Sequence, residues 1–232
     1  MTGAAAGHGR DEELLLARIS AAAGRAGLGR RRATYRAPDT GPGTRWAAVG
    51  AVARRLLRAV GGPAPGTGAR LDLYEHGITA VRGSRIHAVR FDTTVVRRCR
   101  VPSARGVTRA LVLVDVDGER IVLRHGDFGR PREWWPGIRR AVTDAQVPRA
   151  LAALGRGARL DFGPVWITGE EVGSGGTALR WAQVRRIEVL DGSVTVHAVG
   201  RRRVWAAVTG IPNPCVLRAL TEHLTRAGRD DD

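Results

Sequence analysis

Histidine is the side chain most often used for acid–base and metal chemistry near neutral pH. The chain has six histidines, namely His8, His76, His87, His125, His197 and His223. A catalytic or metal-binding set requires two or three such groups to converge. No spacing among these six is typical of a shared site. We therefore expect them to be solvated or held by structural hydrogen bonds, and we predict no metal site and no catalytic residue.

The other candidate nucleophiles and carboxylates also lack the surroundings that catalysis needs. Cys99 and Cys215 lie far apart without C-x-x-C spacing, which predicts buried free thiols rather than a zinc site. Ser174 lies in "GSGG", without the context of a hydrolase elbow or a phosphate loop, so a hairpin turn is expected. Glu170 and Glu171 are adjacent, and on a strand they would point to opposite faces. These residues predict a protein that is not an enzyme and has no cofactor.

The charge of the chain indicates a function more strongly than its candidate catalytic residues do. All 38 basic residues are arginine, and 22 acidic residues leave a net charge of +16. Residues 1–70 contain twelve arginines and four acidic residues, a net +8, and residues 71–232 contain 26 and 18, also +8. The absence of lysine indicates the codon bias of a GC-rich genome. The concentration of charge in the leading segment favours an anionic partner, namely a membrane surface, a nucleic acid or an acidic protein.

Residues 44–60 could form a basic amphipathic helix. On a helical wheel, Trp46 falls on an apolar face, and Arg54, Arg55 and Arg58 fall on the opposite face. Such a helix can lie on an anionic bilayer with its tryptophan at the interface. It can equally pack on the protein with its arginines solvated, and Gly50 weakens the helix itself. Both interpretations remain open.

A second basic group lies at a predicted strand turn. It comprises Arg201, Arg202 and Arg203, and Arg185 and Arg186 lie on a neighbouring predicted strand. Side chains alternate across a strand, so only part of this group can share a face. The group could form a solvated sheet edge, where charge discourages edge pairing, or an anion pocket.

The first part of the chain predicts a helix followed by strands and a second helix. A helix is expected at residues 11–23, and period-two patterns from residue 71 onward predict a meander of strands. Within it, a turn is expected at Gly83 and Ser84, another at residues 102–106, and a third at Asp117 and Gly118. Residues 133–157 are helical in pattern, and Pro148 is expected to split them into two helices.

The second part repeats this order. Strands are expected at residues 159–162, 164–168, 178–182, 184–190, 193–199 and 202–208. A closing helix is expected after Asn213 as its N-cap, with Pro214 in the first turn and Gly228 at its end. Val216, Leu217, Leu220 and Leu224 are its predicted buried stripe.

Landmarks correspond between the two passes: Gly77 with Gly169, Phe91 with Trp181, and "ERIVL" with "RRRVW". We therefore predict a duplicated, mainly β, α+β fold of two antiparallel β-rolls laid end to end, each closed by a helix. The expected domains are an N-terminal helix and tail at 1–34, a basic segment with a Gly/Pro linker at 35–70, modules at 71–156 and 157–228, and an acidic tail at 229–232.

Several stretches together resemble an uncharacterised family of tandem pleckstrin-homology-like (PH-like) proteins from GC-rich bacteria. They are "LLARISAAAGRAGLGRRRATYRAP", "LYEHGI", "VPRALAALGRGARLDFGPVWIT", "RWAQVRRIEVLDGSVTV" and "IPNPCVLRALTEHL". The resemblance covers most of residues 14–225 except 37–70, and "RPREWWPG" departs from it. It implies two tandem PH-like modules and offers no functional residue to carry over.

These observations predict a binding or scaffold protein. The longest uncharged run, residues 204–217, has fourteen residues and two prolines, whereas a membrane-spanning helix needs about twenty apolar residues. No secretory signal precedes the chain's first helix. We expect a cytoplasmic protein at the inner face of an anionic membrane or on a membrane-bound protein. Charge-driven nucleic-acid binding is the alternative, although aromatic residues make up only 5% of the chain.

Overall fold

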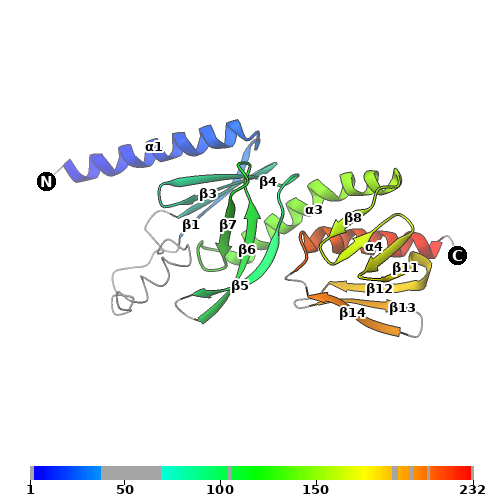
Figure 1. Ribbon diagram of the computed structural model, residues 1–232. Coiled ribbons are helices and arrows are strands. Elements are labelled where there is room, and N and C mark those ends of the chain that lie inside the picture. Colours follow the sequence, from blue (N-terminus) through cyan, green and yellow to red (C-terminus); the bar gives the residue numbers. More distant parts are fainter. Residues whose placement is uncertain are drawn as a thin grey trace.

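The computed structural model describes residues 3–37, 69–103, 106–189, 193–198, 201–207 and 210–230. Within these residues the protein is a mixed α+β fold, mainly β, with fourteen strands in four antiparallel sheets and three α-helices (Figure 1). This confirms the fold class predicted from the alternating patterns. One helix lies at the N-terminal end of the described chain and another at its C-terminal end.

Residues 31–155, here called the first unit, follow the N-terminal helix α1 (Gly3–Arg25) and form two sheets and a helix. The first sheet has the order β1-β2-β3-β4, and the second has the order β5-β6-β7. The elements are β1 (Arg31–Arg36), β2 (Arg70–Tyr74), β3 (Gly77–Arg82), β4 (Arg85–Arg90), β5 (Arg97–Ser103), β6 (Gly106–Val114), β7 (Arg120–Arg124) and α3 (Pro131–Gly155). The predicted turn at Gly83 is confirmed, with Gly83 at a φ of 59°.

Residues 160–230, here called the second unit, have the same order of elements. A four-stranded sheet, β11-β10-β9-β8, is followed by a three-stranded sheet, β12-β13-β14, and a helix. The elements are β8 (Leu160–Phe162), β9 (Val165–Ile167), β10 (Glu171–Ser174), β11 (Thr177–Arg180), the short 3-10 helix η2 (Trp181–Gln183), β12 (Val184–Val189), β13 (Ser193–Ala198), β14 (Arg201–Ala207) and α4 (Pro214–Asp230). Strand β10 was not predicted, because Gly173 and Ser174 were expected to lie in the turn "GSGG".

The landmark aromatics occupy matching places. Phe91 directly follows β4, which is the last strand of the first four-stranded sheet in chain order. Trp181 directly follows β11, which is the last strand of the second four-stranded sheet in chain order. Both side chains are buried in the core. The segments "ERIVL" and "RRRVW" likewise contribute to β7 and β14, the third strands of the two three-stranded sheets.

Three predictions about the helices are wrong. Helix α1 begins at Gly3 rather than near residue 11. Helix α3 continues through Pro148, which was expected to divide it. Proline lacks the N–H that would bond the carbonyl four residues earlier, but buried residues on both sides of it, Val142 and Leu154 among them, fix the helix against one core. Helix α4 continues past Gly228 to Asp230.

Buried apolar residues of the two units form one connected cluster, although the repeat predicted two rolls laid end to end. The cluster runs from the first unit's sheets through α3 and α4 into the second unit, and α3 lies beside α4 in Figure 1. Arg139 on α3 donates from Nε to Cys215 Sγ on α4 at 3.0 Å. The two units are therefore packed against each other.

Helix α1 packs on the first four-stranded sheet. A separate small cluster joins Ala23 and Leu28 to Tyr74 and Ala88. Figure 1 shows α1 lying along one edge of the molecule, with contacts to β3 and β4. Gly27 and Gly29 adopt left-handed φ values of 63° and 77°, which glycine permits at little cost. These two glycines turn the chain from α1 into β1.

Asp92, just after β4, links the first sheet to α3. Its carboxylate accepts hydrogen bonds from Arg90 at 2.8 and 3.0 Å and from Arg149 NH1 at 3.1 Å. The hydrogen bond from Arg90 is the main cause that lowers the pKa of Asp92 to about 2, with Arg149 contributing and partial burial opposing. The folded state therefore favours the ionised form of this carboxyl.

We expect Asp92→Asn to destabilise the protein by about 2 kcal/mol near neutral pH, and by much less near pH 2. The folded pKa is depressed below its usual value of 3.8, so the stabilisation is complete above that value and is lost as pH falls through about 2. Urea unfolding of the wild type and of D92N at both pH values measures the difference. An equal difference at the two pH values would contradict the assignment.

Candidate functional site

The predicted amphipathic segment, with Trp46, Arg54, Arg55 and Arg58, lies outside the described residues. Its membrane role stays a prediction.

The second predicted basic group, Arg201–Arg203, lies on β14 and divides between two faces. The strand register places Arg202 opposite His197, which is in turn opposite Arg186 on β12. Arg203 is on the other face, where its NH1 donates to Thr177 Oγ1 on β11 at 3.2 Å. The register thus agrees with the expectation that only part of this group shares a face. Arg186 is itself ion-paired with Glu188.

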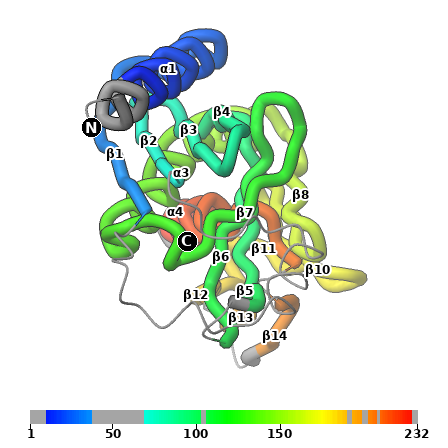
Figure 2. Tube along the Cα trace, turned by 90° about the vertical axis from the view of Figure 1, so that its left-hand side faces the viewer, coloured from blue at the N-terminus to red at the C-terminus, as the bar shows by residue number. Residues whose placement is uncertain are grey.

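The β5–β6 hairpin carries a basic surface that was not predicted from the sequence. We call residues 97–109 the basic hairpin, since this segment contains five arginines and no acidic residue. The register places Arg100 directly opposite Arg109, and Val107 lies opposite Pro102 on the same face. Arg100 and Arg109 are exposed, and Val107 exposes 71% of its surface. Both Figure 1 and Figure 2 place the outer end of this hairpin at the lower edge of the molecule, as they do β14.

The strand register explains why the hairpin extends beyond the core. Leu111, two residues after Arg109 on the same face, is fully buried and lies opposite Leu123 on β7. The partner strand β7 ends at Arg124, opposite Ala110. Beyond that point β5 and β6 continue as a two-stranded ribbon, and the face that covered the core becomes solvent-exposed at Arg109. The side chains of Arg100 and Val107 on this ribbon are exposed to solvent.

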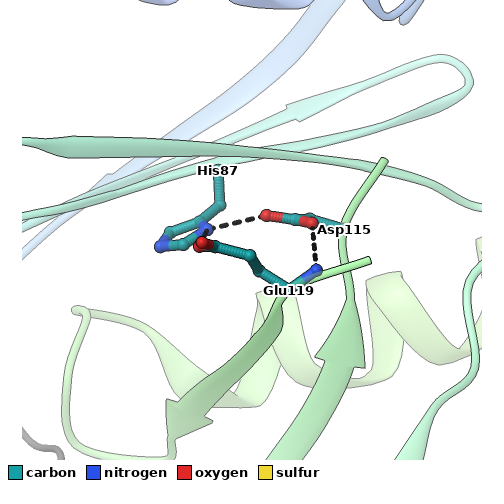
Figure 3. Close-up of side chains that lie close together, drawn as sticks. All are labelled: His87, Asp115 and Glu119. Atoms are coloured by element: carbon teal, nitrogen blue, oxygen red, sulfur yellow. Dashed lines mark hydrogen bonds and ion pairs between the residues drawn. The ribbon is translucent and has the colours of Figure 1, made fainter. Parts of the chain in front are cut away.

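A second cluster joins His87, Asp115 and Glu119 (Figure 3). His87 Nδ1 lies 2.8 Å from Asp115 Oδ2 and 3.8 Å from Glu119 Oε2. The exposed fractions of the three side chains are 12%, 2% and 48%, in that order. His87 is held by a structural hydrogen bond, as expected for the histidines, and the fold also brings a second carboxylate close to it, which the spacing did not indicate.

The fold brings these residues together by docking one sheet on the other. His87 lies on β4, whereas Asp115 and Glu119 bracket the turn between β6 and β7. The backbone N–H of Val116 donates to the carbonyl of Ala88 at 2.9 Å, which ties this turn to β4. No local pattern could indicate this cluster, because its members come from two sheets and 28 residues separate His87 from Asp115.

Asp115 is held by the turn that it closes. Its Oδ1 accepts hydrogen bonds from the backbone N–H groups of Asp117 at 3.0 Å and Glu119 at 2.7 Å. Its Oδ2 is directed to His87. Arg85 NH1 lies 3.2 and 3.0 Å from the two carboxylate oxygens of Glu119. The cluster thus combines one imidazole, two carboxylates and one flanking guanidinium.

Two cavities lie away from both surfaces. One of about 270 Å³ is lined by residues of α3 and the second unit, including Arg149 and Phe162, and one of about 420 Å³ lies beside α1 and includes Arg30. Neither lining includes His87 or a residue of the basic hairpin. A substrate-sized pocket next to the His87 cluster would be needed for acid–base catalysis, and these two cavities do not provide it.

A family of unknown function, DUF6585, matches residues 67–230. The chain belongs to this family. The match begins just before β2 and ends at the last residue of α4. Helix α1 and strand β1 precede it. Strand β1 nevertheless completes the first four-stranded sheet of this DUF6585 protein by pairing with β2. Neither the curated proteins nor the solved structures compared with the chain include a match.

The two thiols of this DUF6585 protein lie on different elements, Cys99 on β5 and Cys215 on α4. Both are free and only partly buried, rather than fully buried as predicted. Burial raises the pKa of Cys99, which disfavours its reactive thiolate.

Among the residues that the structure describes, no helix combines the length and the apolar character needed to span a bilayer.

Proposed function

We propose that this DUF6585 protein is a non-enzymatic binding protein that associates peripherally with an anionic membrane surface through the basic hairpin. The observation that supports this most directly is the placement of Arg100 opposite Arg109 on an exposed two-stranded ribbon without acidic residues. These arginines give the exposed ribbon a basic surface, which favours an anionic partner.

Membrane association also has a plausible energetic scale. Each arginine near an anionic bilayer contributes about 1 kcal/mol. Val107, exposed on the same face as Arg100 and Arg109, adds an apolar group that could enter the headgroup region. The predicted amphipathic segment with Trp46, Arg54, Arg55 and Arg58 would add to this attraction if it lies on the membrane, as would Arg201–Arg203.

The order of elements supports a binding role by analogy. A four-stranded sheet, a three-stranded sheet and a closing helix occur in each unit. We propose that the units are tandem PH-like modules, a fold that displays loops and strand ends to partners. Because a fold hosts many functions, the proposal depends on the hairpin rather than on this analogy. A cytoplasmic location at the inner face of a bacterial membrane belongs to the same proposal.

The test is co-sedimentation of the full chain with phosphatidylcholine vesicles that contain or lack phosphatidylserine. We expect binding to the anionic vesicles only. In the double variant R100E/R109E, the apparent affinity should fall about tenfold or more, since about 1 kcal/mol is lost for each arginine. The matched control is R132E/R156E, which changes two exposed arginines at the ends of α3 and alters the net charge equally.

The outcomes separate the alternatives. Equal loss in both double variants would show that net charge matters and the hairpin does not. Equal or negligible binding to both kinds of vesicle would remove the membrane proposal. Strong DNA or RNA binding near physiological salt, with a steep salt dependence, would favour the nucleic-acid alternative.

A further inference from the structure

We propose that His87, Asp115 and Glu119 bind one divalent transition-metal ion. The three donor atoms are His87 Nδ1 and one carboxylate oxygen each from Asp115 and Glu119, and all lie within 4.8 Å of one another. Figure 3 shows both acidic side chains next to the same edge of the imidazole ring, while its other nitrogen points away from them. The inference is independent of membrane binding.

Two of the three donor separations are close to those of a tetrahedral zinc site. Zinc binds nitrogen and oxygen at about 2.0–2.1 Å, so neighbouring ligand atoms in a tetrahedron lie about 3.3 Å apart. The separations from His87 Nδ1 are 2.8 Å to Asp115 and 3.8 Å to Glu119. One must open and the other close by about half an ångström. Glu119 is half-exposed and can make the larger movement.

A hydrogen bond accounts for only part of this arrangement. The Nδ1 atom of a neutral imidazole carries at most one proton and can satisfy one carboxylate, and Asp115 occupies that place at 2.8 Å. Glu119 brings a second carboxylate toward the same nitrogen. A cation between the three groups would bind both carboxylates at once, in competition with Arg85 for Glu119. Metal binding through Nδ1 requires the tautomer with its proton on Nε2, so a neutral His87 binds without net loss of a proton.

Two features of the site fix Asp115 in advance. The backbone N–H groups of Asp117 and Glu119 hold its Oδ1, which leaves Oδ2 as the inward ligand. The bond from Val116 to Ala88 fixes the turn against the strand that carries His87. Outer hydrogen bonds of this kind orient metal ligands and strengthen binding. When the ion enters, Glu119 moves inward and the His87–Asp115 pair opens by about half an ångström.

The donor set selects the class of metal. One imidazole and two carboxylates suit zinc, cobalt and manganese, and among these the affinity order favours zinc over cobalt and manganese. Three protein ligands leave a fourth position for water or another group. Zinc and cobalt are therefore suitable probes.

Arg85 provides an internal check on the proposal. Its NH1 contacts both oxygens of Glu119, and its side chain is largely exposed. The guanidinium competes with an incoming cation for Glu119. Replacing Arg85 with glutamine should strengthen metal binding, although it removes an ion pair. A purely structural cluster does not predict this gain.

The experiment is calorimetric titration of the chelator-treated full chain with zinc chloride, with cobalt absorption as a report on tetrahedral geometry. We expect one equivalent of zinc in the wild type, a loss of affinity of about 100-fold or more in H87Q and D115N, and about fivefold tighter binding in R85Q. D115N retains an oxygen for the two turn N–H groups, so it preserves the fold better than an alanine. His223→Gln, an exposed histidine on α4, is the matched control and should bind like the wild type.

Absence of zinc binding in the folded wild type would overturn the proposal. So would an equivalent of zinc that survives both H87Q and D115N unchanged, because that ion would occupy another site. Circular dichroism of each variant checks that its fold is retained.

Discussion

Replacing Gly77 with alanine is expected to destabilise the protein by about 3 kcal/mol. A β-carbon at this position would overlap the backbone carbonyl oxygen of Val89 and lie 2.6 Å from Leu28 Cδ2. Gly77 begins β3 and pairs with Arg90 on β4, while Leu28 is fully buried in the small cluster under α1. The carbonyl cannot rotate away as a side chain would, so β3, β4 and the chain after α1 must separate.

Gly169 is the matched control, because the sequence places it at the corresponding point of the second unit. The nearest atom to a β-carbon built there is the Leu154 carbonyl oxygen at 3.6 Å, an ordinary contact. Gly169→Ala should change the free energy of unfolding by about 0.5 kcal/mol or less. Urea denaturation compares the two variants, and similar effects at both positions would show that the backbone at Gly77 yields easily.

Replacing Asn213 with glycine should cost about 3 kcal/mol, by removing the side chain that joins the two units. Asn213 Oδ1 accepts from the backbone N–H of Val96, and Nδ2 donates to the Thr94 carbonyl at 3.3 Å and to Gln146 Oε1 at 2.8 Å. All three partners belong to the first unit. Glycine keeps the left-handed φ of 47° at this position, so the loss reports the side-chain bonds rather than backbone strain.

A double-mutant cycle identifies the coupling. Gln146 donates from Nε2 to the carbonyls of Phe91 and Thr94 and therefore shares the network with Asn213. The combined variant N213G/Q146A should be about 1 kcal/mol less destabilised than the sum of the single variants. Additive effects, or a cost of N213G below about 1 kcal/mol, would show that the Asn213 side chain does not couple the two units.

Asn213 also shows where local signals mislead. The sequence predicted an N-cap, and the backbone carbonyl of Asn213 does accept from Val216 and Leu217 at the start of α4. Its side chain, however, bonds across to Val96, 117 residues away in the sequence. The sequence alone does not distinguish an asparagine that caps a helix from one whose side chain bonds to a distant segment, because both lie in the turn before a helix.

Turn residues and strict alternation were sufficient to predict the hairpin at Gly83, a turn within "GSGG" and the corresponding places of Phe91 and Trp181. They also predicted most of the stripe on α4, where Val216, Leu217 and Leu220 are buried. These features depend on neighbours within a few residues, and local periodicity records such neighbours. The mainly β fold class and the repeated order of elements follow from them.

Tertiary structure alone decided the features on which the proposals rest. The strand register set Arg100 opposite Arg109, and the docking of one sheet on the other brought Asp115 and Glu119 to His87. Packing on both sides of Pro148 kept α3 continuous, and the approach of the Val89 carbonyl and of Leu28 distinguishes Gly77 from Gly169. Each of these depends on segments distant in sequence, whose contact energies outweigh local preference, and periodicity within one segment carries no record of them.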